Sequence, residues 1–257
     1  MLFRSDFPQE QRGLLKKSRD VLREHSKVLL KHSKVLLNLY DTEQKLRVPD
    51  LPQEQRDLLE KSRDVLLKHS KVLREHSEVL LNLYDTKQKL RDPGLIKIER
   101  PPLVRSREVL QEHSKILQEH SKVLQQLHDT HHQLRDPEFS ETERTLLKES
   151  REVLQEHDEV LLNLYDTEQK LRGLHDASDE ESHYLHFYLE KDRKVLREHR
   201  KVLQQLQDTL HKLRDHNILP DQHADLQGSR ERLQKRSEEL KNLYDDNQKA
   251  RLAWQDF

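Results

Sequence analysis

Residues Ser18 to Arg47 read SRDVLREHSKVLLKHSKVLLNLYDTEQKLR, and this unit decides the fold because most of the chain repeats it. Two full copies follow at Ser62–Arg91 and Ser106–Arg135, and three shortened copies at Ser150–Arg172, Asp192–Arg214 and Ser229–Arg251. Inside the unit lies a finer period of seven, in which Ser-Lys-Val-Leu recurs at Ser26 and Ser33. Such a pattern is typical of long amphipathic helices that bury an apolar stripe against neighbouring copies.

Proline and glycine separate the copies and mark the expected ends of the helices. They occur as Pro49, Pro52, Pro93, Gly94, Pro137, Gly173 and Pro220. The sequence predicts helices at about 8–47, 52–91, 102–135, 141–172, 179–215 and 221–253. Ser140-x-x-Glu143 and Ser178-x-x-Glu181 match the capping box that begins a helix. Because the links are short, consecutive helices should be antiparallel neighbours. We therefore predict an all-α fold, an antiparallel long-helix repeat bundle of six helices with heptad packing.

The first three copies keep one heptad more than the last three. Helices of equal length pack best against each other, so this step predicts two consecutive three-helix units, at 1–137 and 138–257. A single six-helix bundle and a curved solenoid are the alternatives.

The composition excludes several classes of protein. Apolar residues make up 32% of the 257 residues and charged residues 37%, which suits long helices with a narrow buried stripe. Lysine plus arginine (47) balances aspartate plus glutamate (48), so we expect no nucleic acid partner. There is no cysteine, which excludes disulfides and thiolate chemistry. No signal peptide or transmembrane segment is evident, so we expect a cytoplasmic protein.

Histidines recur within the apolar stripe: His25 lies about 40° around the helix from Val21. Antiparallel pairing then predicts histidine layers. The first two are His25, His76, His113 and His32, His69, His120, and the third is His157, His199 and Arg236. Three hypotheses follow: half-buried polar spacers that bond Ser and Glu and fix the register, a pH-sensitive latch, or metal sites such as three imidazoles on Zn²⁺. Glu24 and its equivalents should lie on the outer face and pair with Lys27 and its equivalents.

Two further sets of residues are candidates for binding. His128 and His132 are four residues apart on one helical face, which is a spacing for metal ligands. The recurring Asn-Leu-Tyr segment places tyrosines at the edge of the stripe, where they could mark a face for a partner helix. These tyrosines are Tyr40, Tyr84, Tyr165 and Tyr244.

No phosphate-binding glycine loop, HExxH or G-x-S-x-G occurs, so we expect no catalytic residues, no cofactor and no enzymatic activity. The pattern favours a structural or scaffold protein that mediates assembly or protein–protein interaction, with a protein partner or self-assembly. One alternative is an amphipathic protein that coats a lipid or particle surface, which the diluted stripe does not favour. The other is a pH- or metal-responsive bundle acting through its core histidine layers.

Overall fold

Each copy of the repeat unit forms one long α-helix. The computed structural model describes residues 9–174, 180–215 and 219–255, and within them it contains six helices and no strand. They are α1 (Gln9–Leu46), α2 (Gln53–Lys89), α3 (Arg100–Leu134), α4 (Glu141–Gly173), α5 (Glu180–Leu213) and α6 (Pro220–Gln255). The all-α prediction is confirmed, and the helix ends lie close to the predicted ones.

Local side-chain bonds explain where α4 begins. At α4 the Ser140 hydroxyl accepts the backbone N–H of Glu143 at 3.3 Å, and the Glu143 carboxylate accepts the N–H of Ser140 at 2.8 Å. The capping box predicted there is confirmed, whereas the one predicted at Ser178 lies outside the described residues. Arg144 then donates to the carbonyls of Phe139 and Asp136, which ties the link to the first turn of α4.

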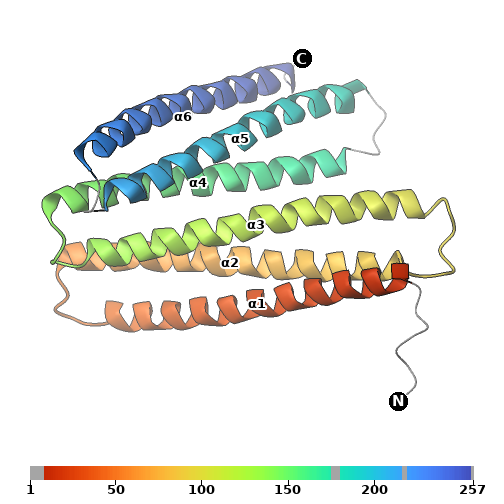
Figure 1. Ribbon diagram of the computed structural model, residues 1–257, viewed down its shortest axis with the longest axis horizontal. Helices are drawn as coiled ribbons and strands as arrows, with labels where there is room; N and C mark the ends of the chain where they lie inside the picture. The colour runs from red at the N-terminus through yellow and green to blue at the C-terminus, as the bar shows by residue number, and fades with distance from the viewer. Residues whose placement is uncertain (1–8, 175–179, 216–218, 256–257) are drawn as a thin grey trace.

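The helices form a row in which the chain runs back and forth, so that each helix lies beside the next one in the sequence (Figure 1). Among the described residues, the helices whose backbones approach each other closely are the consecutive pairs, from α1 with α2 to α5 with α6. One cluster of buried apolar residues runs through the row from Val21 of α1 to Leu213 of α5, with Leu226 and Leu233 of α6 packed against it.

Two columns of apolar residues carry this packing. The valine column of α1 is Val21, Val28 and Val35, all buried; the leucine column is Leu15, Leu22, Leu29 and Leu36. Between α5 and α6 the pairing of the columns is explicit, because Val195 and Val202 of α5 form a cluster with Leu240 and Leu233 of α6. The valine column of one helix therefore packs against the leucine column of the following helix.

Helices α3 and α4 pack against each other and contribute to the same buried cluster. The division into units at 1–137 and 138–257 concerns independent folding, and it stays a prediction.

Candidate functional site

The histidines of the column form a ladder of hydrogen bonds between consecutive helices. His25 and His32 of α1 contact the hydroxyls of Ser77 and Ser70 of α2, at 2.7 and 2.8 Å. The same two contacts recur one helix further on, where His69 and His76 of α2 contact Ser121 and Ser114 of α3, both at 2.9 Å. Each serine directly follows the histidine that the predicted layers placed opposite, so the register of the contacts differs from the predicted one by one residue. These contacts are those expected of polar spacers bonded to serine; that they fix the register of the helices stays a prediction.

Between α3 and α4 a carboxylate replaces the serine. His120 Nε2 contacts Asp158 Oδ1 at 2.5 Å, and Lys68 of α2 reaches the other oxygen of Asp158 at 3.0 Å. Burial alone would raise the pKa of Asp158, but the bonds from His120 and Lys68 outweigh it and lower this pKa. The added negative charge is thus matched by a cation two helices back along the row.

Between α4 and α5 the replacement has the opposite charge. Arg200 occupies the serine position, and its Nη2 lies 3.0 Å from Glu119 Oε2 of α3. The other oxygen of Glu119 lies 3.3 Å from His157 Nε2 of α4. Glu156 occupies the corresponding position one helix later, 3.3 Å from His199 Nε2, and His199 also contacts Ser237 of α6 at 2.7 Å.

These contacts correct two predictions. Glu119 and Glu156, equivalents of Glu24, were expected on the outer face, yet they are partly buried against histidines of the following helix. The i,i+3 pairs themselves occur, as Glu24 with Lys27 and Glu112 with Lys115. Arg236 was expected in the third layer, but it is exposed and pairs with Glu198 and Glu239. The residue that meets His199 is its neighbour Ser237, with the same one-residue offset from the predicted layer that Ser77 shows opposite His25.

Burial changes the titration of the inner histidines. It lowers the pKa of His69, His76, His113 and His131 to about 4. Desolvation disfavours the charged imidazolium, and neighbouring cations add to this effect. The same four side chains are almost fully buried, with relative exposures of 1–2%. His131 differs from the others because neither of its ring nitrogens has a hydrogen-bond partner. The sequence does not predict the burial of His131, because the equivalent position in the first two copies holds a charged residue, Glu43 or Lys87.

The described residues form no cluster of metal ligands that would support the metal hypothesis. Among the described residues there is no group of three or more His, Asp or Glu side chains that could hold a metal ion. Most of the layer histidines point their Nε2 atoms at hydroxyls or carboxylates, as His25 does at Ser77, whereas His113 contacts Gln169 through Nδ1 and its Nε2 has no hydrogen-bond partner. His128 Nδ1 contacts Ser62 at 2.9 Å, whereas His132 is exposed, so the structure does not bring this pair together on one ligand. Metal binding by these histidines stays a prediction.

The four candidate tyrosines do not share one surface. Tyr40 is exposed on α1, while Tyr84, Tyr165 and Tyr244 are half-buried and packed against the core cluster. The ring of Tyr165 lies 5.2 Å from that of His113, centre to centre. Burial raises the pKa of Tyr165 and Tyr244. Only Tyr40 among the four presents most of its side chain to solvent.

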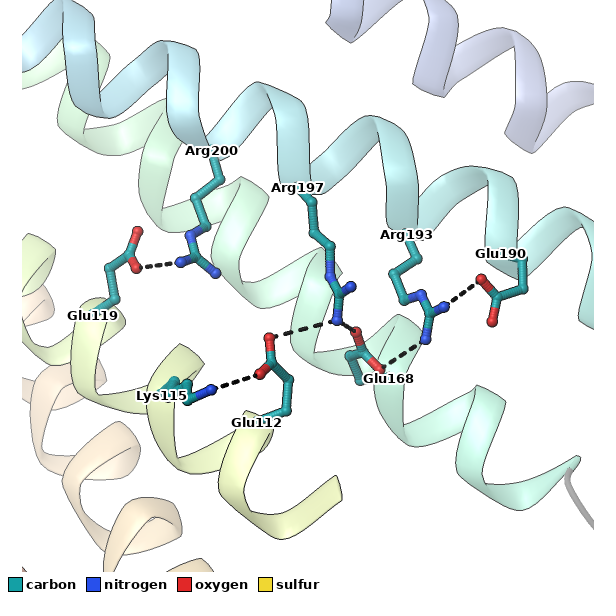
Figure 2. Close-up of polar contacts among 8 residues, drawn as sticks. All are labelled: Glu112, Lys115, Glu119, Glu168, Glu190, Arg193, Arg197 and Arg200. Atoms are coloured by element: carbon teal, nitrogen blue, oxygen red, sulfur yellow. Dashed lines mark hydrogen bonds and ion pairs between the residues drawn. The ribbon is translucent and has the colours of Figure 1, made fainter. Parts of the chain in front are cut away.

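A network of ion pairs joins α3, α4 and α5 (Figure 2). Arg197 of α5 contacts Glu168 of α4 at 2.8 Å and Glu112 of α3 at 3.5 Å, and Arg193 lies 3.7 Å from the other oxygen of Glu168. Glu168 is nearly buried, so its charge is held by these two arginines. In this network the arginines beside the leucine column of α5 form ion pairs with carboxylates of the two preceding helices.

The most unusual surface of the molecule is the leucine column of α1. Leu22, Leu29 and Leu36 are 41–47% exposed, whereas their equivalents in α2, Leu66, Leu73 and Leu80, are 1–2% exposed. The side chains are identical; the difference is that the described residues place no helix against this side of α1. Further exposed apolar side chains of α1 are Leu15, Leu30, Leu37 and Tyr40. Extended apolar surface of this kind marks interaction sites.

The serines of this face also lack their usual contact. Ser26 and Ser33 hold the positions at which Ser70 and Ser77 meet histidines, but their hydroxyls donate to the carbonyls of Leu22 and Leu29 in their own helix. The face of α1 therefore displays the leucines and serines that, in α2, receive a preceding helix. We call Leu15, Leu22, Leu29, Leu36, Ser26 and Ser33 together the acceptor face of α1.

An open groove of about 650 Å³ lies where α1, α2 and α3 meet. Val21, Leu80 and Leu83 contribute apolar surface to it, and Lys17, Lys87 and Arg107 contribute positive charge. Burial lowers the pKa of Lys87, and the nearby Arg107 and Lys17 act in the same direction. Asp20 and Glu24 also line the groove, so it presents charges of both signs on the inner side of α1, next to α3.

Comparisons of the chain with protein-family models, with curated proteins and with solved structures found no match. None of the described helices combines the length and apolarity needed to cross a membrane.

Proposed function

We propose that this protein is a non-enzymatic helical-repeat scaffold that holds a protein partner through the acceptor face of α1. The observation that carries the proposal is the exposure of Leu22, Leu29 and Leu36 at positions that α2 buries almost completely. Removing such side chains from water is the main source of favourable free energy in association. The packed row of helices behind the face supports it, since a face that is already folded needs little ordering on binding.

A second function is favoured by the inner histidines, which burial keeps neutral. Acidification would protonate these histidines inside the packed row, where burial disfavours the charged form. The scaffold would therefore loosen as the pH falls. This pH response is an alternative to the partner-binding function and needs no partner.

Affinity capture from the native source tests the scaffold function. The wild-type chain is compared with a Leu22→Glu/Leu29→Glu variant and with a matched control, Leu81→Glu/Leu162→Glu, whose leucines are 44% and 48% exposed elsewhere on the surface. We expect the same proteins to be retained by the wild type and the control and lost by the α1 variant. Retention of the same proteins by all three chains would refute the proposal.

A further inference from the structure

The repeats within this chain show what kind of element covers a leucine column. In α6 the column is covered by the valines of α5: Val195 and Val202 cluster with Leu233 and Leu240. The covering helix also sends His199 to Ser237, which lies between those leucines in the sequence. The covering element is therefore an antiparallel helix with valines and a histidine spaced Val-x-x-x-His-x-x-Val.

Helix α5 is the closest template for α1 because both contain the sequence Val-Leu-Arg-Glu-His, at Val21–His25 and Val195–His199. Arg19 and Arg23 of α1 correspond to Arg193 and Arg197 of α5. In α5 these two arginines bind Glu168 of α4, the helix that precedes it (Figure 2). In α1, Arg19 and Arg23 are exposed, and the ion pair of Arg23 within the described part of the chain is with Asp20, at 3.9 Å.

The charges beside the leucine column favour an acidic occupant. Exposed cations line one edge of the column: Lys16, Arg19, Arg23, Lys27 and Lys34. Two of them have i,i+3 partners in Asp20 and Glu24, which lie on the side away from the leucines. A second copy of α1 laid antiparallel on this face would bring two rows of like charge together. A helix with a glutamate at the position of Glu168 would instead place a carboxylate between Arg19 and Arg23.

The far end of the row cannot supply this helix from another copy of the chain. In α6 the positions equivalent to Val195 and Val202 hold Arg232 and Glu239, and both side chains are exposed. The position of His199 holds Arg236. Head-to-tail stacking of copies would therefore press charged residues onto the leucines of α1, at the cost of their hydration.

We propose that the acceptor face of α1 binds an amphipathic helix of a second protein that carries Val-x-x-x-His-x-x-Val heptads and, eleven residues after the histidine, a glutamate, as α4 does with Val153, His157, Val160 and Glu168. This inference rests on the scaffold function proposed above and names its partner. The bound helix lies antiparallel to α1, its valines cover Leu22 and Leu29, and its histidine meets Ser26. Its glutamate lies between Arg19 and Arg23.

The test uses the full chain and a synthetic peptide of residues 141–173 in which Leu154→Gln and Leu161→Gln remove the peptide's own leucine column. Titration calorimetry should show binding to the wild-type chain and to the Leu81→Glu/Leu162→Glu control. Binding to the Leu22→Glu/Leu29→Glu variant should be about 100-fold weaker, because two leucines lose their burial. Circular dichroism should show that all three chains keep the same helix content, since the substituted residues are exposed.

A charge exchange tests the orientation. Arg19→Glu/Arg23→Glu should weaken binding about 10-fold, and a peptide that also carries Glu168→Lys should restore it. If the reversal has no effect, or the exchanged peptide does not restore binding, the proposed antiparallel placement is overturned.

Other occupants would overturn the proposal and give distinct results. A second copy would appear in sedimentation velocity as a dimer that Leu22→Glu/Leu29→Glu dissolves. A lipid surface would appear as co-sedimentation with phosphatidylserine–phosphatidylcholine vesicles that the same variant abolishes. If the peptide fails to bind while affinity capture still depends on Leu22 and Leu29, the scaffold function stands and the helix pattern named here is wrong.

Discussion

The buried histidines should make the stability of this protein fall on mild acidification, and His69 and His76 allow the size of the effect to be worked out. Burial lowers the pKa of both to about 4, from about 6.5 in an unfolded chain. A histidine whose pKa is lowered in the folded state contributes its full stabilisation at pH values above about 6.5, the pKa in the unfolded chain. That contribution is lost as the pH falls from 6.5 towards 4, because the unfolded chain then binds protons that the folded chain does not.

At pH 5 this linkage amounts to about 2 kcal/mol for each such histidine. His69→Leu/His76→Leu therefore removes about 4 kcal/mol of the acid sensitivity, which corresponds to roughly 8–16 °C of Tm for a chain of this length. The serines left behind, Ser121 and Ser114, can donate to their own helix as Ser26 does, so no buried hydroxyl is stranded.

Thermal unfolding followed by circular dichroism at pH 7 and pH 5 measures the effect. The Tm of the wild type should be lower at pH 5 than at pH 7. This decrease in Tm should be smaller in the double variant by roughly 8–16 °C. His132→Leu is the matched control, because His132 is exposed and should leave the fall unchanged. An equal fall in the wild type and the double variant would refute the burial of His69 and His76. The carboxylates do not confuse the comparison, since the lowered pKa of Asp158, Glu119 and Glu156 makes their contribution vanish only below about pH 4.

Three further predictions concern stability. Ser140→Ala removes the cap of α4 and should lower the free energy of unfolding by about 1 kcal/mol in urea titration; an unchanged midpoint would contradict the capping box. Leu66→Ala should cost about 2–5 kcal/mol and Leu22→Ala less than about 0.5 kcal/mol in the same assay, because only Leu66 is buried; equal losses would show that α1 is covered. Residues 1–137 and 138–257, expressed separately, should each be helical and melt cooperatively; two unfolded halves would show that the six helices need one shared core.

Features that depend on local sequence could be predicted, whereas those that depend on a third helix could not. The heptads place His25 opposite His76, within one residue of its actual partner Ser77, and Ser140 with Glu143 marks the start of α4; both features need only one helix or one pair of helices. The inward position of Glu119 depends on His157 and Arg200, which belong to the next two helices. A helical wheel drawn for one helix assigns such a residue to solvent.

The exposure of the acceptor face also depends on the neighbouring helices and could not be predicted from the local sequence. Leu22 and Leu66 follow the same Ser-Arg-Asp-Val sequence, so pattern alone predicts the same burial for both. Their exposures differ because α2 has a helix on each side and α1 has one. The exposure of the leucine column is therefore a property of the position in the row, and only the arrangement of the helices reveals it.

The central claim is that the row leaves one leucine column uncovered, and hydroxyl-radical footprinting of the isolated chain tests it most directly. Side-chain oxidation measured by mass spectrometry should be fast at Leu22, Leu29 and Leu36 and slow at Leu66, Leu73 and Leu80, which serve as internal controls of the same residue type. Equally slow oxidation of the two sets, at concentrations where the chain is monomeric, would contradict the claim, because the acceptor face of α1 would then be covered by the chain itself.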